Sequence, residues 1–159
     1  MSTRWVLVDG YSVLHAWPKL CKLAGRSLEQ QRDALVRVLR QYADQSGAHL
    51  TVVFDGYRAK HKPEPVGAAA GAEVVFSEAG KTADDVIERL VAQAERRENI
   101  LVVTSDNMVR RTVESLGARS MSSEIFDAEV EAALKDLAKA VRAHSRPRRI
   151  GSLREDLER

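Results

Sequence analysis

Cysteine, aromatic residues and long apolar runs are all scarce in this sequence. The 159 residues include a single cysteine, Cys21, and aromatic residues make up only 5% of the chain. One cysteine excludes an internal disulfide framework and a cysteine-rich zinc cluster, and it agrees with a reducing compartment. No apolar run approaches membrane-spanning length, and no basic stretch followed by an apolar segment follows Met1. We therefore expect a cytoplasmic protein with no signal peptide and no membrane partner.

A large excess of one charge sign is also missing. The formal net charge is +2 at pH 7, which is too small to indicate a nucleic-acid partner by itself, so only the distribution of basic residues carries that argument. Neither a P-loop nor the glycine fingerprint of a dinucleotide site occurs, so we expect no organic cofactor. With 44% hydrophobic and 30% charged residues, the chain has the composition of one globular domain.

Short apolar runs alternate with amphipathic segments along the chain. The runs are rich in β-branched and aromatic residues, which is typical of strands, and they cover residues 4–9, 50–57, 73–78, 100–107 and 118–121. Apolar residues at helical spacing predict helices from Ser27 to Gly47, from Thr82, from Asp106 to Gly117 and from Phe126 to Val141. This alternation predicts an α/β fold with a mostly parallel central sheet of about five strands, flanked by helices.

Two segments fall outside this regular pattern. The stretch from Arg58 to Ala72 has two prolines, two glycines and three consecutive alanines without a period, so we expect an exposed, mobile loop. Residues 142–159 include several arginines, and we expect a basic, partly disordered C-terminal tail. Residues 1–141 then form the single domain.

Aspartates stand where the predicted strands end and helices begin. Asp9, Asp55 and Asp106 end strands, and Asp84 and Asp85 lie in the first turn of a helix. Because ligands of open α/β sheets bind at the carboxyl ends of the strands, we expect these acids to lie toward one edge. Crowded carboxylates repel one another unless a cation lies among them. Oxygen ligands alone favour Mg²⁺ or Mn²⁺ over zinc.

Several of these acids also have a purely structural interpretation. Asp55 precedes Gly56, a pair that is common in turns. Asp85 follows Thr82 by three residues, and we favour a helix-capping role for it over direct catalysis. Asp106 is placed to cap the helix that follows it.

Asp9 and Asp84 are the stronger functional candidates. Asp9 ends a buried strand before Gly10 and offers little to folding, because burying an unpaired carboxylate is costly. Asp84 is placed to complement the helix dipole, but it also shares a helix face with Glu88, four residues on. Asp85 points elsewhere, so we favour Asp84 over Asp85.

Four segments together resemble the YacP-like NYN-domain family, relatives of the PIN-domain nucleases. They are VLVDGYSVLHAWP at 6–18, VVFDGY at 52–57, VVFSEAGKTADDVIERLV at 74–91 and VVTSDNMVRRTVESLGA at 102–118. The similarity covers roughly residues 4–141. It implies a three-layer PIN-like fold, a divalent-metal site and endonucleolytic cleavage of single-stranded RNA. In at least one class of members the substrate is messenger RNA at the ribosome.

The resemblance also implies roles for individual residues. Asp9, Asp84 and Asp106 correspond to the metal-binding and catalytic acids, with Asp85 and Asp55 as weaker metal candidates. Ser12 departs from the family, which commonly has Asn there. A serine hydroxyl still donates and accepts hydrogen bonds, so we expect altered hydrogen bonding around the site and retained function.

Positive charge beside the acids is expected to hold the RNA backbone. Three aromatic rings are candidates for stacking on bases near the site, those of Tyr11, Trp17 and Tyr57, although core packing is the better interpretation of Trp17. The alternative for each basic residue is a solvated surface position. The RNA-binding candidates are Tyr11, Ser12, Arg58, Lys60, His61, Lys62, Lys81, Arg110 and Arg111.

Other classes of protein remain as alternatives. A non-catalytic PIN-like module that binds RNA or a ribosomal partner is the main one, but none of the three main acids is missing. A haloacid-type phosphatase requires a second acid two residues after Asp9, where Tyr11 stands. A receiver domain requires an acidic pair and a lysine after its last strand, and neither is evident.

Overall fold

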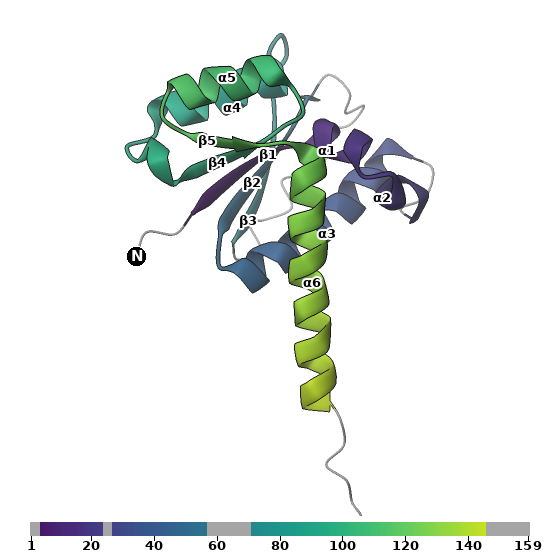
Figure 1. The fold of residues 1–159 in the computed structure, drawn as a ribbon. Coiled ribbons are helices and arrows are strands. Elements are labelled where there is room, and N and C mark those ends of the chain that lie inside the picture. The colour runs from purple at the N-terminus through teal and green to yellow at the C-terminus, as the bar shows by residue number, and fades with distance from the viewer. Residues whose placement is uncertain (1–3, 24–26, 57–70, 146–159) are drawn as a thin grey trace, which may run out of the picture.

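The computed structural model describes residues 4–23, 27–56 and 71–145. Strands and helices alternate along the chain (Figure 1). In order, the elements are β1 (Trp5–Asp9), α1 (Gly10–Ala16), α2 (Pro18–Leu23), α3 (Leu28–Ser46), β2 (His49–Phe54), β3 (Ala72–Phe76), α4 (Ala83–Gln93), the short 3-10 helix η2 (Arg97–Asn99), β4 (Ile100–Val103), α5 (Asn107–Ser115), β5 (Arg119–Met121) and α6 (Ser123–Ser145).

The five strands form one sheet in the order β3-β2-β1-β4-β5, and every neighbouring pair is parallel. The expected α/β fold with a parallel sheet is therefore confirmed. Because all strands run the same way, their carboxyl ends share one edge. β1 is the central strand, with Asp9 opposite Val53 of β2 and Val8 opposite Val103 of β4. Asp9 therefore lies at the middle of that edge.

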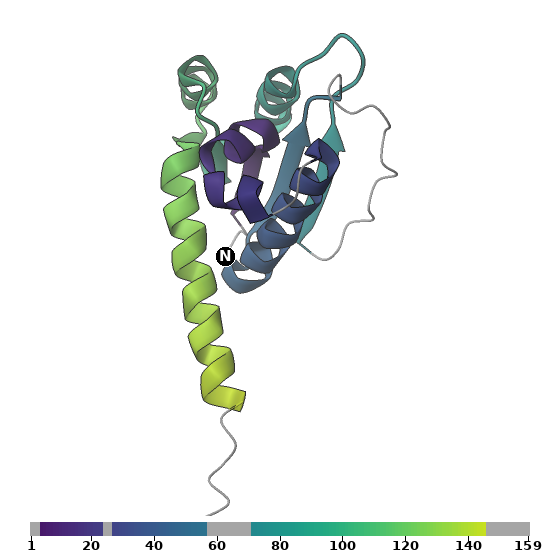
Figure 2. The same cartoon turned by 90° about the vertical axis from the view of Figure 1, so that its right-hand side faces the viewer.

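Helices cover both faces of the sheet, which gives three layers. Figures 1 and 2 show α4 and α5 together on one side, and α3 and α6 on the other. Side chains of β1 alternate between the two faces: Val6 and Val8 belong to the core under α3 and α6, whereas Leu7 belongs to the core under α4 and α5. Each face thus has its own apolar core.

Two capping boxes fix where long helices begin, as the sequence predicted. Ser27 and Gln30 exchange hydrogen bonds at the start of α3, and Thr82 and Asp85 do so at the start of α4. Gly47 ends α3 in the left-handed conformation, with φ of 71°, which glycine adopts without steric cost. None of the described helices combines the length and apolarity that crossing a bilayer requires.

The structure differs from the sequence-based expectation in two places. The segment after Asp9, where no helix was predicted, forms the helices α1 and α2. α6 runs through Arg142 to Ser145 and extends beyond the rest of the domain (Figures 1 and 2), so the first four residues of the expected tail are helical. Residues 146–159 and 57–70, which include the rest of that tail and most of the expected mobile loop, lie outside the described residues.

Candidate functional site

Asp9 ends β1 and caps the helix that follows. One carboxylate oxygen, Oδ1, accepts a hydrogen bond from the backbone N–H of Ser12 at 3.5 Å, and Oδ2 accepts one from the Thr104 hydroxyl at 3.1 Å. The expectation that Asp9 contributes little to folding was therefore wrong in part. Burial raises the pKa of Asp9 above its ordinary value, these two hydrogen bonds oppose the rise, and the charges of Asp106 and Asp55 add to it.

Asp106 caps α5 and is linked to Asp9 through one side chain. Its Oδ1 accepts hydrogen bonds from the backbone N–H groups of Met108 and Val109 at 2.9 and 3.4 Å, which confirms the capping interpretation. Its own N–H donates to the Thr104 hydroxyl at 3.2 Å. Thr104 is fully buried, and its hydroxyl both accepts from Asp106 and donates to Asp9. This residue, which the sequence argument missed, fixes the two acids relative to each other.

Asp84 and Asp85 are neighbours with opposite surroundings. Asp85 belongs to the capping box, where its Oδ2 accepts from the Thr82 N–H at 3.0 Å and its N–H donates to the Thr82 hydroxyl at 3.2 Å. Hydrogen bonding of the Asp85 carboxyl to Thr82 lowers the pKa of this exposed group. Asp84 is half-buried, and within the described part of the chain its carboxylate accepts no hydrogen bond. Burial, followed by the charges of Asp9 and Asp106, raises the pKa of Asp84 to about 6.

Two further carboxylates lie within electrostatic reach of these acids. The charge of Asp55 raises the pKa of Asp9, and the charge of Glu88 raises the pKa of Asp84. Glu88 was not predicted as a site residue, although its spacing of four from Asp84 on α4 was the signal that could have found it. We call Asp9, Asp55, Asp84 and Asp106 the acid edge.

Both glycines that follow acids of this edge are required by close packing. A Cβ on Gly10 would lie 2.2 Å from the Phe54 ring, and a Cβ on Gly56 would lie 2.1 Å from the carbonyl oxygen of Ser77. Neither glycine has a positive φ, so the close approach of neighbouring atoms, and not a left-handed backbone conformation, requires glycine at both positions. The missing side chains let the ends of β1 and β2 approach their neighbours closely.

The donor chemistry of the acid edge suits a hard divalent cation. Every candidate ligand is a carboxylate oxygen, and like charges that raise one another's pKa are stabilised by a positive ion. Within residues 4–23, 27–56 and 71–145, however, no group of three or more histidine, cysteine, aspartate or glutamate side chains is placed to hold a metal ion. The chemistry of the donors therefore fits Mg²⁺ or Mn²⁺, while the side chains as placed do not form a ready coordination sphere.

Two residues that were predicted to contact RNA make contacts within the protein instead. Tyr11 is buried, its ring centroid lies 5.3 Å from that of Phe54, and its hydroxyl accepts a hydrogen bond from Arg32 at 3.2 Å. Stacking of Tyr11 on a base does not fit this position. The Ser12 hydroxyl accepts from the Ser105 N–H at 2.7 Å and lies 2.9 Å from the Ser123 hydroxyl, so it too is engaged within the protein.

Trp17 is buried, as its core-packing interpretation predicted. The remaining aromatic candidate and four basic ones lie outside the described residues, so their roles stay predictions: Tyr57, Arg58, Lys60, His61 and Lys62.

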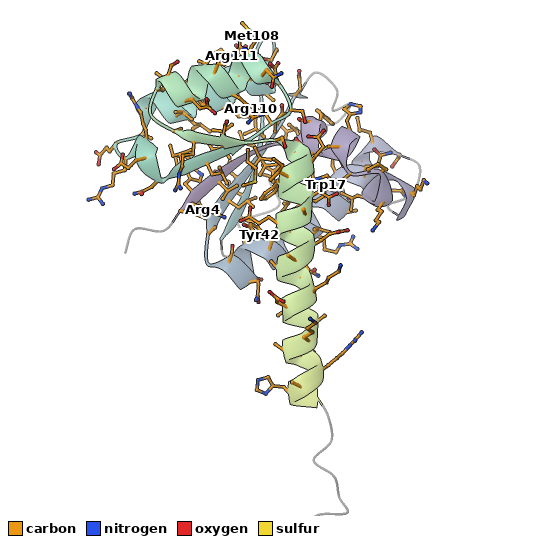
Figure 3. All side chains as sticks on the ribbon, viewed as in Figure 1. Arg4, Trp17, Tyr42, Met108, Arg110 and Arg111 are labelled. Atoms are coloured by element: carbon orange, nitrogen blue, oxygen red, sulfur yellow. The ribbon has the colours of Figure 1, made fainter. Side chains whose placement is uncertain are left out.

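The basic residues of α5 begin one helical turn after Asp106. Arg110 is partly buried, and its Nε donates to the Ser120 hydroxyl at 3.1 Å, whereas Arg111 is exposed. Figure 3 labels both arginines on α5. They line a surface hollow together with Asn107 and Glu114. At the start of α4, Lys81 is exposed, and its charge helps to lower the pKa of Asp85. Three of the predicted RNA contacts thus lie close in sequence to the acids that begin α4 and α5.

Comparisons with known proteins agree with this architecture. The model of the family described as "YacP-like NYN domain" matches residues 6–159. The "Uncharacterized protein YacP" of Bacillus subtilis (strain 168) is 34% identical over 139 residues, which cover 86% of this chain and 81% of that protein. The crystal structure of Rae1 (YacP) from Bacillus subtilis is similar with a TM-score of 0.75 and 29% identity, covering 99% of this chain and 90% of that chain. A mutant of the same protein gives a TM-score of 0.76 at 29% identity, with 94% and 89% of the two chains covered.

Proposed function

Because the chain belongs to the YacP-like NYN-domain family, we propose that it is a divalent-metal-dependent endoribonuclease that cleaves single-stranded RNA. The observation that carries this proposal is the position of Asp84. Its carboxylate is half-buried without a hydrogen bond in the described residues, and its pKa is raised to about 6 by burial and by Asp9 and Asp106. Such a group costs folding free energy, and a bound cation would remove that cost.

The acids that would hold Mg²⁺ or Mn²⁺ are Asp9, Asp84 and Asp106, with Asp55 as a further candidate. Asp85 is the weakest candidate, because its carboxylate already accepts the hydrogen bond from the Thr82 N–H that completes the capping box. A metal ion held by Asp9, Asp84 and Asp106 would supply a water of lowered pKa and would neutralise charge on the phosphate being cleaved.

The protein's own contribution is to hold two of the acids in place. The Thr104 hydroxyl donates to Asp9, which lowers the pKa of that carboxyl against the effect of burial. Two backbone N–H groups of α5 do the same positioning for Asp106, where the positive end of the helix dipole also favours a negative charge. Asp9 and Asp106 are thus fixed, whereas the Asp84 carboxylate lies within electrostatic reach of both and accepts no hydrogen bond from the described residues.

The substrate side of the proposal rests on positive charge. Lys81, Arg110 and Arg111 flank the acid edge in sequence, and arginine binds phosphate through its planar group of donors. We propose messenger RNA at the ribosome, in the cytoplasm, as the substrate because of the family resemblance. A non-catalytic RNA-binding module is the second candidate, and the buried aromatic ring of Tyr11 offers it no support.

The test is cleavage of labelled single-stranded RNA, with and without ribosomes, in Mn²⁺ or in EDTA. We expect the wild type to cut only with metal, and Asp84→Asn to lose at least about 100-fold in rate, because a metal site is worth several kcal/mol of transition-state stabilisation. Asp44→Asn, an exposed aspartate of α3, is the matched control and should cut like the wild type. Metal-independent cutting, or full activity of Asp84→Asn, would contradict the proposal.

A further inference from the structure

The hydroxyl of Ser12 joins three segments that are distant in sequence. It accepts a hydrogen bond from the Ser105 N–H at 2.7 Å, across 93 residues, and lies 2.9 Å from the Ser123 hydroxyl, across 111 residues. Because Ser105 uses a lone pair of the Ser12 oxygen, the Ser12 proton remains available to Ser123. We call this arrangement of Ser12, Ser105 and Ser123 the Ser12 bridge.

One side of the Ser12 bridge is anchored in the core. Ser123 is fully buried at the start of α6, and its carbonyl oxygen accepts a hydrogen bond from the Trp17 indole at 3.0 Å. Trp17 is buried as well, and its ring centroid lies 6.0 Å from that of Phe126. The end of α1 and the start of α6 therefore hold each other, and the Ser12 hydroxyl has a fixed partner.

The other side of the bridge is the loop that carries Asp106. Ser105 is exposed, and its N–H is held by Ser12, while the next N–H, that of Asp106, is held by Thr104 at 3.2 Å. Two successive backbone groups are thus tied to two different hydroxyls. The Thr104 contact sets Asp106 relative to Asp9, and the Ser12 contact sets the same loop relative to α1 and α6.

We propose that Ser12 is a positioning residue, whose hydroxyl holds the Ser105–Asp106 loop so that the Asp106 carboxylate stays at the acid edge. This replaces the expected role of Ser12 as a contact to RNA, and it rests on the proposed function in treating Asp106 as a functional acid. Groups that hold a ligand residue in place typically affect metal affinity or activity by about 10- to 100-fold, because displacements of about 1 Å are costly to catalysis.

The direct test compares Ser12→Ala with Ser115→Ala in the full, metal-free chain. The Ser115 hydroxyl is likewise hydrogen-bonded to the backbone, although as a donor, to the carbonyl oxygen of Arg111 at 2.9 Å. Ser115 lies at the far end of α5. Amide hydrogen exchange measured by NMR should speed up at Ser105 by about 10-fold or more in Ser12→Ala, because that amide loses its acceptor. Ser115→Ala should leave the Ser105 amide unchanged.

Kinetics then separates positioning from RNA binding. Ser12→Ala should lower kcat for RNA cleavage by about 10- to 100-fold with KM nearly unchanged, as expected for a group that supports a catalytic acid. Ser12→Thr, which keeps the hydroxyl, should recover both the exchange protection of Ser105 and most of kcat. A raised KM with normal exchange at Ser105 would overturn the proposal, because that pattern identifies an RNA contact.

Ser123→Ala gives a second, independent measurement. This variant keeps the Ser105 to Ser12 bond but removes the buried partner of Ser12, so exchange at Ser105 should increase less than in Ser12→Ala. If the wild type cleaves RNA and neither variant changes exchange or kcat, the Ser12 bridge is refuted and the nuclease proposal stands. If the wild type cuts no RNA with metal, the nuclease proposal fails, while faster exchange at Ser105 still supports the bridge.

Discussion

The charged residues near the two ends of β1 have opposite kinds of neighbours. Before its N-terminal end, Arg4 donates a hydrogen bond to the Tyr42 hydroxyl at 2.7 Å and lies 3.6 Å from the Glu129 carboxylate (Figure 3). Arg4 thus contacts both a hydroxyl of α3 and a carboxylate of α6, although the Oε2 atom of Glu129 is buried without a hydrogen-bond partner among the described residues. We call Arg4, Tyr42 and Glu129 the paired cluster.

The C-terminal end of β1 gathers charges of one sign. At the acid edge, Asp9 and Asp84 each have a pKa raised by burial and by the neighbouring carboxylates. Among the described residues, no lysine or arginine forms an ion pair with Asp9 or Asp84. A paired charge avoids the folding cost of an unpaired buried charge, whereas like charges held together point to a site that binds something else. The comparison therefore assigns stability to one end of the strand and function to the other.

Metal should produce the largest change in stability, and only through the acid edge. Mn²⁺ at about 100 times its dissociation constant should raise the free energy of unfolding by about 2.7 kcal/mol, because it binds the folded state alone. Urea unfolding with Mn²⁺ and with EDTA measures this difference. Asp84→Asn should lose most of the response, and Arg4→Ala should keep all of it. An equal response in Asp84→Asn would show that the metal does not bind through the acid edge.

Removing the cation of the paired cluster should have the next largest effect. Arg4→Ala should lower the free energy of unfolding by about 1 to 2 kcal/mol, because Glu129 then loses its partner. The effect is moderate because both side chains of the pair are 36% exposed. Lys19→Ala, which breaks the more exposed pair with Glu131 at 3.4 Å, is the control and should cost less than about 0.5 kcal/mol. Loss of RNA cleavage in folded Arg4→Ala would contradict the division between the two ends.

The smallest effect is the pH dependence that Asp84 confers without metal. Its pKa in the folded protein is about 6, against an ordinary 3.8. Between those values the folded state keeps a proton that the unfolded state has released, so stability falls as pH rises through this window. After discounting for partial exposure, we expect a loss of about 1 kcal/mol in EDTA. Asp84→Asn should lack most of this loss, and an unchanged pH profile in that variant would show that Asp84 is not destabilising.

Much of the fold could be predicted from local patterns in the sequence. The strands of the sheet and the capping boxes at Ser27 and Thr82 follow from residues within a few positions of one another. The helices α1 and α2 were missed because α1 begins at a glycine, Gly10, and because both helices are short, with Trp17 between them and Pro18 as the first residue of α2. The glycine is explained only by the Phe54 ring packed against it, which lies on another strand.

Only part of the candidate site could be predicted from the sequence. That Asp84 lies within electrostatic reach of Asp9 and Asp106 agrees with parallel strands that end at one edge, and the capping role of Asp106 follows from its position before a helix. The Thr104 contact to Asp9 spans 95 residues, and the Ser12 bridge spans more than one loop. No local pattern indicates such contacts, because they depend on how the loops meet after folding.

The most direct test of the central claim is crystallography of the protein with Mn²⁺, using the anomalous signal of manganese to locate the ion. Our account predicts a peak at the carboxyl edge of the sheet, with oxygen atoms of Asp9, Asp84 and Asp106 as its protein ligands. A fully occupied Mn²⁺ elsewhere, or Asp84 remaining apart from Asp9 and Asp106 at saturating metal, would contradict it.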